Sequence, residues 1–408
     1  MSPRRAELLR QTINLPLAST NLYSGNRSVI CGAGRYTALF KMIKKESSRS
    51  VLILGGAGFI GSNLASWILR NSSARVHIFD NLSRPGVRNN LEWLQQSDRN
   101  SGRLQITVGD IRDASQVESV VRPATEIYHF AAQVAVTTSV VEPRLDFEVN
   151  LAGTFNVLEA ARKGGNRPFL LFTSTNKVYG DFGSTDLYVD GKRYRNRNSQ
   201  GTSEEQPLDF HSPYGCSKGA ADQYVRDYAR IYGLRTVVFR MSCIAGARQF
   251  GNEDQGWVAH FLYSALRGAP VTIYGNGKQV RDVLCVDDLL RAFEAARRLS
   301  PCSEGRIYNI GGGAKNTLSL LELMDLVERL TVKKLDAQFD QPRPGDQLYY
   351  VTDYSKFRNE SGWEPEIAPE GTLSRIYEFW KKNPDLFAIG TSASKVVRTP
   401  SPELAQPA

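Results

Sequence analysis

A buried strand that ends in a glycine-rich turn and leads directly into a helix constrains the fold of this chain more than any other stretch. It reads SVLILGGAGFIGSNLASWILR and begins at Ser50, with glycines at the first, fourth and seventh places of the turn, Gly55, Gly58 and Gly61. The first glycine permits a tight turn, the second lets a pyrophosphate approach the backbone, and the third lets the helix pack closely on the strand. The helix N-terminus then faces the phosphates. The stretch therefore predicts the first unit of a dinucleotide-binding domain.

Short apolar segments alternate with helical segments after this turn. Strands are expected in RVHIFDNLSR, LQITVGDIRD, EIYHFAAQV, FLLFTSTNKVYG and LRTVVFRMSCIAG, with helices between them in DASQVESVV and FEVNLAGTFNVLEAARKG. Such alternation predicts a parallel sheet covered by helices on both faces. Together with the glycine turn it indicates an α/β fold with a doubly wound, Rossmann-type sheet.

The texture of the sequence changes after Gly246, where a smaller mixed α/β lobe is expected. We predict a helix in WVAHFLYSALRG, a hairpin-like pair of strands in VTIYGNGKQVRDVLCVDD, a further short strand in RIYNIGGG, and a helix in NTLSLLELMDLVERL capped by Thr317. Such a lobe is expected at the carboxyl edge of the sheet, where open α/β folds form their ligand crevice.

The basic character of the chain is confined to its beginning. The net charge is +9 over 408 residues, and residues 1–50 alone hold nine Lys or Arg and only two acidic residues. The rest is nearly neutral, so no nucleic-acid partner is expected. No apolar run reaches the ~20 residues that span a bilayer, so no membrane partner is expected. The five scattered cysteines favour a reducing, cytoplasmic location over a disulfide framework.

These observations predict four parts of the chain. Residues 1–49 form a basic, disordered extension, an organelle-targeting peptide, or a segment upstream of a true start at Met42. Residues 50–246 are mainly the dinucleotide-binding domain with its catalytic helix, and residues 247–387 are mainly the substrate lobe. Residues 388–408, rich in Ser, Pro and Ala, are expected to be a disordered tail. The polar insertion at 181–210 is open to two interpretations, a substrate lid or a solvated loop.

An acidic residue about twenty positions after the glycine turn indicates which dinucleotide is bound. Asp80 ends the second strand, where a carboxylate accepts hydrogen bonds from the adenosine ribose and repels a 2′-phosphate. NAD is therefore favoured over NADP, although Arg84 keeps the alternative open. Asp110 and Ile111 close the third strand, where an adenine would lie; a helix-capping carboxylate and an ordinary core residue are equally good explanations of this pair.

A tyrosine and a lysine four residues apart provide the candidate chemistry. Tyr214 and Lys218 lie in LDFHSPYGCSKGAADQY, where Pro213 favours the start of a helix that continues to Gly233. Residues four apart share one helix face, and a nearby ammonium favours the phenolate. The pair predicts removal of a proton from a substrate hydroxyl beside a hydride acceptor. A bare spacing of this kind is common on surface helices, so the assignment depends on the cofactor turn.

Several motifs in one order and spacing carry a family resemblance. GGAGFIG, DNLSR, GDIRD, HFAAQV, STNKVYG and SPYGCSK resemble the extended short-chain dehydrogenase/reductase superfamily of enzymes that modify nucleotide sugars. Within it, QVAVTTS, TSTNKVYGD, DQGWV and GNGKQVRDVL resemble the CDP-paratose 2-epimerases, also called CDP-tyvelose 2-epimerases. The resemblance covers roughly residues 50 to 385. It implies an NAD-dependent isomerase of O-antigen biosynthesis that forms homo-oligomers.

The resemblance also assigns residues. Thr175 completes a catalytic group with Tyr214 and Lys218, and Lys218 also bonds the nicotinamide ribose. The cofactor residues it implies are Gly55, Gly58, Phe59, Ile60, Gly61, Asp80, Asn81, Asp110, Ile111, Ala131, Gln133, Tyr214 and Lys218. The substrate residues it implies are Thr175, Asn176, Gln249, Gln255, Arg281 and Arg343, the two arginines on the diphosphate. No metal is expected, because none of the four histidines has a companion at ligand spacing.

Asn176 and Lys177 narrow the reaction. Sugar 4,6-dehydratases of this superfamily carry an Asp-Glu pair here, and an amide and an ammonium cannot replace that acid/base pair. What is expected instead is transient oxidation and re-reduction of a sugar carbinol, which epimerises CDP-paratose to CDP-tyvelose at C2. The alternatives are a UDP-hexose 4-epimerase with the same catalytic group and, outside enzymes, a catalytically idle NAD-binding sensor or scaffold.

Overall fold

The structure is a computed structural model that describes residues 49–99, 101–180, 186–197, 201–299, 305–343 and 346–387. The predicted N-terminal extension, apart from its last residue, and the whole predicted C-terminal tail, residues 388–408, lie outside the described residues. All described residues belong to one unit of the chain, residues 46–408.

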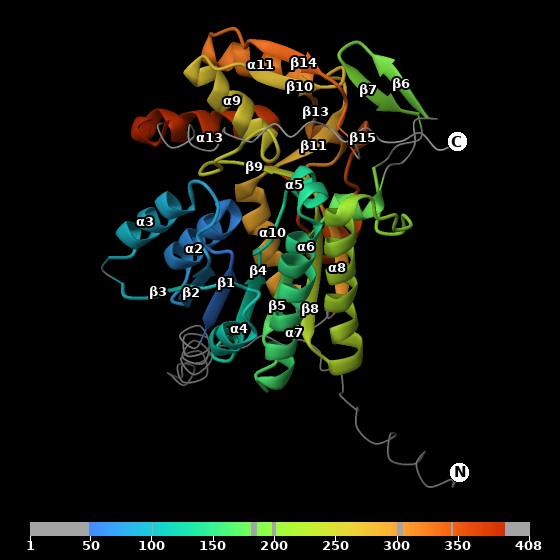
Figure 1. Ribbon diagram of the computed structural model, residues 1–408. Helices are drawn as coiled ribbons and strands as arrows, with labels where there is room; N and C mark the ends of the chain where they lie inside the picture. The colour runs from blue at the N-terminus through green and yellow to red at the C-terminus, as the bar shows by residue number, and fades with distance from the viewer. Residues whose placement is uncertain are drawn as a thin grey trace, which may run out of the picture. The chain divides into compact units, whose positions relative to one another are not determined.

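Seven parallel strands form the central sheet, in the order β12-β8-β5-β4-β1-β2-β3 (Figure 1). Their bounds are β1 Ser50–Leu54, β2 Arg75–Asp80, β3 Leu104–Val108, β4 Glu126–His129, β5 Phe169–Thr175, β8 Arg235–Met241 and β12 Arg306–Ile310. The strand order reverses between β1 and β4, and this switch point is where open α/β sheets bind their ligands. The predicted doubly wound α/β fold is therefore confirmed.

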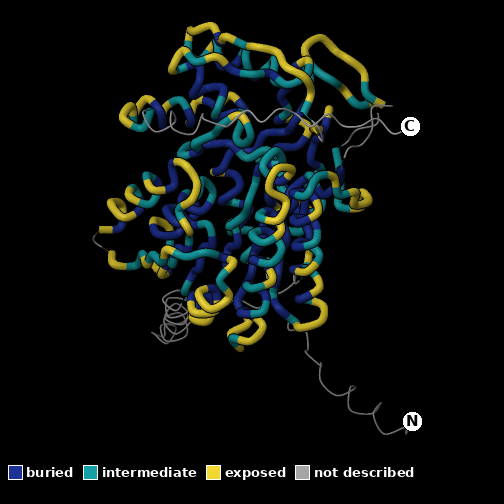
Figure 2. The backbone as a smooth tube through the Cα atoms, viewed as in Figure 1, coloured by how far each residue is buried: buried dark blue, intermediate teal, exposed yellow. Residues whose placement is uncertain are grey.

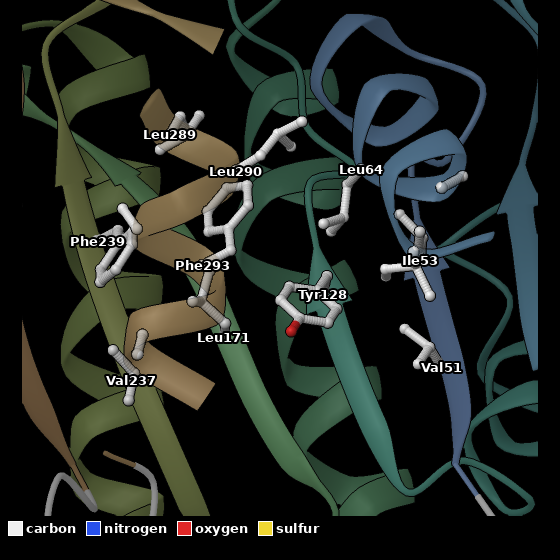
Figure 3. Packing of buried hydrophobic residues seen from close by; sticks show 14 of the residues in the cluster. Val51, Ile53, Leu64, Tyr128, Leu171, Val237, Phe239, Leu289, Leu290 and Phe293 are labelled. Atoms are coloured by element: carbon white, nitrogen blue, oxygen red, sulfur yellow. The ribbon is translucent and has the colours of Figure 1, made fainter. Parts of the chain in front are cut away.

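Alternate residues of each strand point to opposite faces of the sheet, and both faces are apolar. Val51 and Ile53 of β1 belong to one core cluster, whereas Leu52 and Leu54 belong to another. The first cluster is covered by α2 Phe59–Asn71, α3 Val87–Ser97, α10 Val286–Leu299 and α12 Ser355–Ser361, and Figure 3 shows its packing. The second is covered by α4 Ala114–Val121, α7 Gly153–Lys163 and α8 Ser212–Tyr232. Such two-sided burial is what a continuously apolar parallel strand requires.

Two short helices and a π-helical turn connect β4 to α7. They are α5 Val136–Val141, α6 Pro143–Phe147 and η2 Glu148–Ala152, and they pass beside α8 (Figure 1). Single π-helical turns are rare and occur frequently at functional sites. Here the turn leads into the helix that covers the sheet beside α8.

A smaller lobe has its own apolar core. The lobe consists of β9 Cys243–Ala245, α9 Trp257–Arg267, β10 Val271–Tyr274, β11 Val280–Cys285, β13 Thr317–Ser319, α11 Leu320–Thr331, β14 Ala337–Asp340, β15 Tyr349–Tyr350 and α13 Pro369–Lys382, with the short η4 Ala314–Asn316. Side chains of α9, α11 and α13 pack together in this core. Figure 2 shows buried backbone in both the sheet and the lobe. None of the described helices is long and apolar enough to cross a bilayer.

Three details of the predicted lobe are wrong. The RIYNIGGG strand, β12, joins the large sheet beside β8 because its register with Val237–Met241 completes the parallel edge. The strands β10 and β11 do not pair as a hairpin; β10 pairs with β14, and β11 with β9, β13 and β15. The cap of α11 is Ser319 rather than Thr317, because Ser319 and Glu322 form a reciprocal capping box.

The described part of the 181–210 insertion does not line the main cavity, and residues 186–197 of it lie on the smaller lobe. Residues 186–197 contain a hairpin, β6 Leu187–Asp190 with β7 Arg193–Asn196. Arg193 forms an ion pair with Glu322 at the start of α11 and donates to the Thr317 carbonyl at 3.0 Å. Thr202 then bridges to Thr352. Asn309 of β12 donates to the Thr202 carbonyl at 2.9 Å, so the end of the insertion contacts the large sheet. The substrate lid and the solvated loop both stay predictions.

We predict that Phe293 of α10 is a stability determinant. Its buried ring contacts the rings of Tyr128, Phe130 and Phe239 on the face of the sheet that α10 covers. Replacement with alanine should lower the free energy of unfolding by about 3–5 kcal/mol in urea titrations, because the cavity cannot close. The matched change at Phe339, which is 60% exposed, should cost far less; equal losses would contradict this packing.

Candidate active site

One cavity of about 830 Å³ brings together every residue that the sequence assigned to cofactor, catalysis or substrate. It lies where β1, β2, β4, β5 and β8 end and the smaller lobe begins. Carboxyl ends of parallel strands meet at one edge, so residues far apart in sequence converge there. The grouping is consistent with the predicted roles of these residues.

The glycine turn forms a cradle with no room for side chains. Gly55 has a φ of +78°, and a Cβ there would lie 2.6 Å from the backbone nitrogen of Ala131. A Cβ on Gly61 would overlap the Gly55 carbonyl oxygen. No side chain caps the first turn of α2 and no acidic residue occupies it. The exposed helix N-terminus therefore suits a pyrophosphate, and the residues present fit a dinucleotide.

Two carboxylates flank this cradle. Asp80 accepts from the backbone N–H groups of Ala57 at 3.0 Å and Leu82 at 2.9 Å, which fixes it at the end of β2. Burial raises the pKa of Asp80, and these N–H donors oppose the rise. Asp110 accepts from Asn81 at 3.2 Å, and its pairing with Arg112 lowers its pKa to about 2. Both carboxylates can accept hydrogen bonds from hydroxyl groups of a ribose.

Thr175, Tyr214 and Lys218 meet at the end of β5. The Thr175 hydroxyl accepts from the backbone N–H of Lys177 at 3.2 Å and donates to Asn176 Oδ1 at 3.3 Å, and its interaction with Tyr214 opposes the rise of the tyrosine pKa. Lys218 Nζ donates to the Thr173 carbonyl at 2.6 Å and lies 4.1 Å from the centre of the Phe172 ring. All three side chains are buried against the cavity wall. The geometry thus unites the predicted catalytic group.

The electrostatics of this group differ from the sequence expectation. Burial raises the pKa of Tyr214 to about 12; the Thr175 hydrogen bond and the Arg84 charge act in the opposite direction, and Asp146 adds to the rise. Burial likewise lowers the pKa of Lys218 to about 7, against the charges of Asp222 and Asp146. The expectation that Lys218 lowers the tyrosine pKa is therefore wrong for the protein alone. Desolvation outweighs the pairwise charge effect.

The substrate side of the cavity is held by a loop of the smaller lobe. Asn176 Nδ2 donates to Gln347 Oε1 at 3.3 Å, and Lys177 Nζ lies 3.8 Å from Asp346 Oδ1. Arg281 donates to the same Asp346 carboxylate at 2.8 Å. Sequence reasoning missed Asp346 and Gln347, which follow Pro-Gly in the sequence and carry no periodic signal.

Arg343 and the two glutamines lie on the same wall of the lobe. Arg343 donates to the Glu253 carbonyl at 3.0 Å, and its guanidinium lies 3.7 Å from the centre of the Tyr274 ring. Gln249 Nε2 donates to the Ile244 carbonyl at 3.1 Å, and its buried Oε1 has no protein partner among the described residues. Such an acceptor is satisfied by water or by a ligand.

The loop 251–256 connects the lobe to the sheet domain across the cavity. Gln255 accepts a hydrogen bond from Arg84, which follows β2. Asp254 accepts from the Thr137 hydroxyl of α5 at 2.9 Å and lies 3.4 Å from Arg343. Sequence reasoning missed this role of Asp254 and Thr137. The signal that was available is the polar, glycine-bounded run GNEDQG.

Comparison with known proteins agrees with this geometry. A family model described as GDP-mannose 4,6 dehydratase matches residues 52–376. The CDP-paratose 2-epimerase of Salmonella typhi is 42% identical over 339 residues, which cover 81% of this chain and 98% of the relative.

Two solved structures are similar along most of the chain. The UDP-glucose 4-epimerase of Thermotoga maritima with UDP-glucose has a TM-score of 0.70 at 30% identity, covering 82% of this chain and 99% of that one. The UDP-glucuronic acid 4-epimerase of Bacillus cereus with UDP-glucuronic acid and NAD has a TM-score of 0.71 at 26% identity, with the same coverage.

We predict a pH-dependent contribution of Lys218 to stability. Its pKa is about 7 in the folded protein against an ordinary 10.5, so between these values the unfolded chain binds a proton that the folded chain does not. The free energy of unfolding should therefore rise with pH across this window. Lys218→Met should remove this part of the slope, measured by urea unfolding between pH 6 and 10. The same change at the exposed Lys334 should leave the slope intact; identical slopes in both variants would contradict the prediction.

Proposed function

The chain belongs to the family of NAD-dependent nucleotide-sugar epimerases and dehydratases, and we propose that within it the chain epimerises CDP-paratose to CDP-tyvelose at C2. NAD is its cofactor. The observation that carries the proposal is the side chains at 176 and 177, immediately after the catalytic threonine. The 42% identity to a CDP-paratose 2-epimerase supports the choice of substrate.

Epimerisation is favoured over dehydration by the groups beside Thr175. Water elimination from a sugar needs an acid and a base that exchange protons with neighbouring carbons. Asn176 supplies a neutral amide bonded to Gln347, and Lys177 supplies a cation near Asp346. The Asp346 carboxylate is itself engaged by Arg281 and Lys177. These groups suit binding of a sugar or phosphate better than proton exchange.

The residues of the catalytic group divide the work of a reversible oxidation. NAD, when bound, supplies reversible hydride exchange, and return of a hydride to the opposite face of a carbon inverts that carbon. Thr175 and Tyr214 hold the reacting hydroxyl, and Tyr214, as the phenolate, takes the proton of that hydroxyl and later returns it. The raised pKa of Tyr214 holds it as a neutral phenol in the protein alone. Lys218, fixed by the Thr173 carbonyl, places a cation beneath the same edge of the sheet.

The nucleotide end of the substrate is assigned to the wall of the smaller lobe. Arg281 and Arg343 both line the cavity, and guanidinium groups bind phosphate oxygens through paired donors. Both already contact carboxylates, Asp346 and Asp254, which a diphosphate would replace. Contacts remote from the reacting carbon would retain the substrate while its sugar turns over.

A cytoplasmic location is part of the same proposal, supported by the scattered cysteines.

A panel of substrates tests the proposal. Purified protein is incubated separately with CDP-paratose, CDP-tyvelose, UDP-glucose and UDP-galactose, and epimers are followed by NMR. We expect interconversion of the two CDP sugars only. Turnover of the UDP sugars alone would overturn the proposal in favour of a 4-epimerase. Loss of water from any sugar would assign a dehydratase.

Tyr214→Phe should lower the rate of epimerisation by about 10²- to 10⁴-fold, since the reacting hydroxyl loses its proton acceptor. Folding and cofactor content, followed by circular dichroism and bound NAD absorbance, should be unchanged. Tyr224→Phe is the matched control, because Tyr224 lies on the same helix but is 46% exposed. A Tyr214→Phe variant with full activity would exclude Tyr214 as the base.

We also propose that two copies of the chain associate through α7 and α8. Phe155 of α7 and Tyr224 of α8 are 43% and 46% exposed, and their ring centres lie 6.0 Å apart. Ile231 and Tyr232 extend the same apolar surface along α8, with exposures of 65% and 45%. The two helices lie side by side (Figure 1). Exposed aromatic surface of this kind is characteristic of protein interfaces.

Ile231→Glu should convert the protein to monomers, because a charge in the centre of an apolar interface cannot be solvated. Sedimentation analysis of the wild type should give at least twice the mass of one chain. Phe339→Glu is the control, since Phe339 is similarly exposed but lies on the smaller lobe. A wild type that sediments as a monomer would refute the association.

A further inference from the structure

A buried carboxylate behind the catalytic helix has no role in the assignments above. Asp146 of α6 is 0% exposed. It accepts hydrogen bonds from Gln133 Nε2 at 2.9 Å, Asn150 Nδ2 at 3.0 Å and the hydroxyl of Ser217. Ser217 immediately precedes Lys218 on α8. A carboxylate that receives three donors is arranged as an anion, because a protonated carboxyl would need an acceptor in place of one of them.

The donors around Asp146 are themselves fixed. Asn150 lies in the π-helical turn η2, donates to the Gln133 carbonyl at 3.0 Å and accepts from the Gln133 backbone N–H at 3.0 Å. It also donates to the Ser217 hydroxyl at 3.1 Å. These bonds close a buried network that joins the loop after β4, the turn η2 and the helix α8. Such a network holds Asp146 in one position relative to α8.

Lys218 lacks a directly bonded counter-charge. Its ammonium is bound by the Thr173 carbonyl and the face of the Phe172 ring, and no carboxylate of the described residues lies within ion-pair distance. Asp222, one turn further along α8, accepts from two nitrogens of the Arg240 guanidinium, Nε at 2.7 Å and Nη2 at 3.1 Å. The charge of Asp222 is therefore already balanced, whereas every donor to Asp146 is neutral.

We propose that Asp146 is the counter-charge of Lys218, a positioning residue that keeps the buried ammonium charged and its helix in place. An isolated buried charge is strongly unfavourable, and a nearby opposite charge reduces that penalty for both groups. Asp146 supplies this charge, and its hydrogen bond with the Ser217 hydroxyl holds it close to the helix position that Lys218 occupies. The inference rests on the proposed function for the roles of Tyr214 and Lys218.

Other charged and titratable groups face this pair from each neighbouring element. Tyr214 and Asp222 lie on α8, Arg240 on β8, and Arg84 follows β2 and acts on Tyr214. His129 on β4 stays neutral, because burial together with the Lys218 charge lowers its pKa to about 3. Asp222 is the larger of the two charges that act on Lys218, but its carboxylate is already bonded by Arg240. Asp146 has only neutral donors, and it is the anion that acts on both Tyr214 and Lys218.

Removal of the Asp146 charge should change the pKa values of Tyr214 and Lys218 in the same direction. An anion favours the protonated form of each neighbour, so its loss lowers the pKa of Tyr214 and of Lys218 together. Activity that needs the Tyr214 phenolate and the Lys218 ammonium together is bounded by the pKa values of these two groups. The rate rises with pH up to the lower pKa and falls above the higher one. Asp146→Asn should therefore move both limbs of the pH–rate profile to lower pH, by about one unit. A merely structural residue would lower the rate without moving the limbs.

The experiment compares pH profiles of kcat for CDP-paratose in the wild type and three variants. Asp146→Asn removes the charge, and Asp146→Glu keeps it and should return both limbs to their wild-type positions. Asp288→Asn controls for the loss of another buried, hydrogen-bonded carboxylate on α10, across the sheet. Limbs that stay in place in Asp146→Asn, or that move equally in Asp288→Asn, would overturn the proposal.

A second measurement needs no substrate and separates this inference from the proposed function. The rise of unfolding free energy with pH that Lys218 causes should begin about one unit lower in Asp146→Asn than in the wild type. This shift without turnover of any sugar would uphold the counter-charge and reject the proposed reaction. Turnover with an unshifted slope would do the reverse. Where Asp146→Asn does not fold, Asp146→Ser removes the same charge and leaves room for a water; loss of folding in both would assign Asp146 to stability and overturn the proposal.

Discussion

The burial of the Lys218 ammonium is the constraint on which the rest of the site depends. A cation enclosed at the end of β5 is tolerated only with a carbonyl, an aromatic face and a nearby anion to replace water. Thr173 and Phe172 of β5 supply the first two, and these residues can do so only because β5 lies in the middle of the sheet with both faces covered. The same enclosure brings Tyr214 against Thr175 and lets burial dominate its acidity.

The smaller lobe completes the site by reaching back to the sheet domain at several points. Gln347 holds Asn176, Asp254 accepts from Thr137, and Gln255 accepts from Arg84. These contacts surround the cavity with polar groups from both parts of the chain. A reaction in which the oxidised sugar must stay bound while it turns over requires such enclosure.

Local patterns were reliable where one local cause decides the structure. The strands of the large sheet, the helix from Ser212 to Tyr232 and the glycine turn follow from periodicity, from Pro213 and Gly233 as boundaries, and from backbone geometry. Sequence patterns did not predict the pairing of strands whose partners lie far along the chain. The strand Arg306–Ile310 reads as a lobe strand by position, yet it completes the large sheet, and β10 and β11 each find partners far along the chain. The sequence of a short strand does not specify which strand of which sheet it will pair with.

The sequence by itself determined the doubly wound fold and the dinucleotide cradle, because each depends on residue types at short, regular spacing. The spacing of Tyr214 and Lys218 and the family resemblance of Thr175 also predicted a catalytic group, whose side chains line one cavity. Only the tertiary structure decided the charge balance around them. The pKa of Tyr214 rises rather than falls because burial outweighs its charged neighbours. Lys218 is influenced by Asp222 on its own helix and by Asp146, which is seventy-two positions away in the chain and on another helix. Electrostatic interactions depend on distance and on access to water, and neither is written in the spacing of residues along a helix.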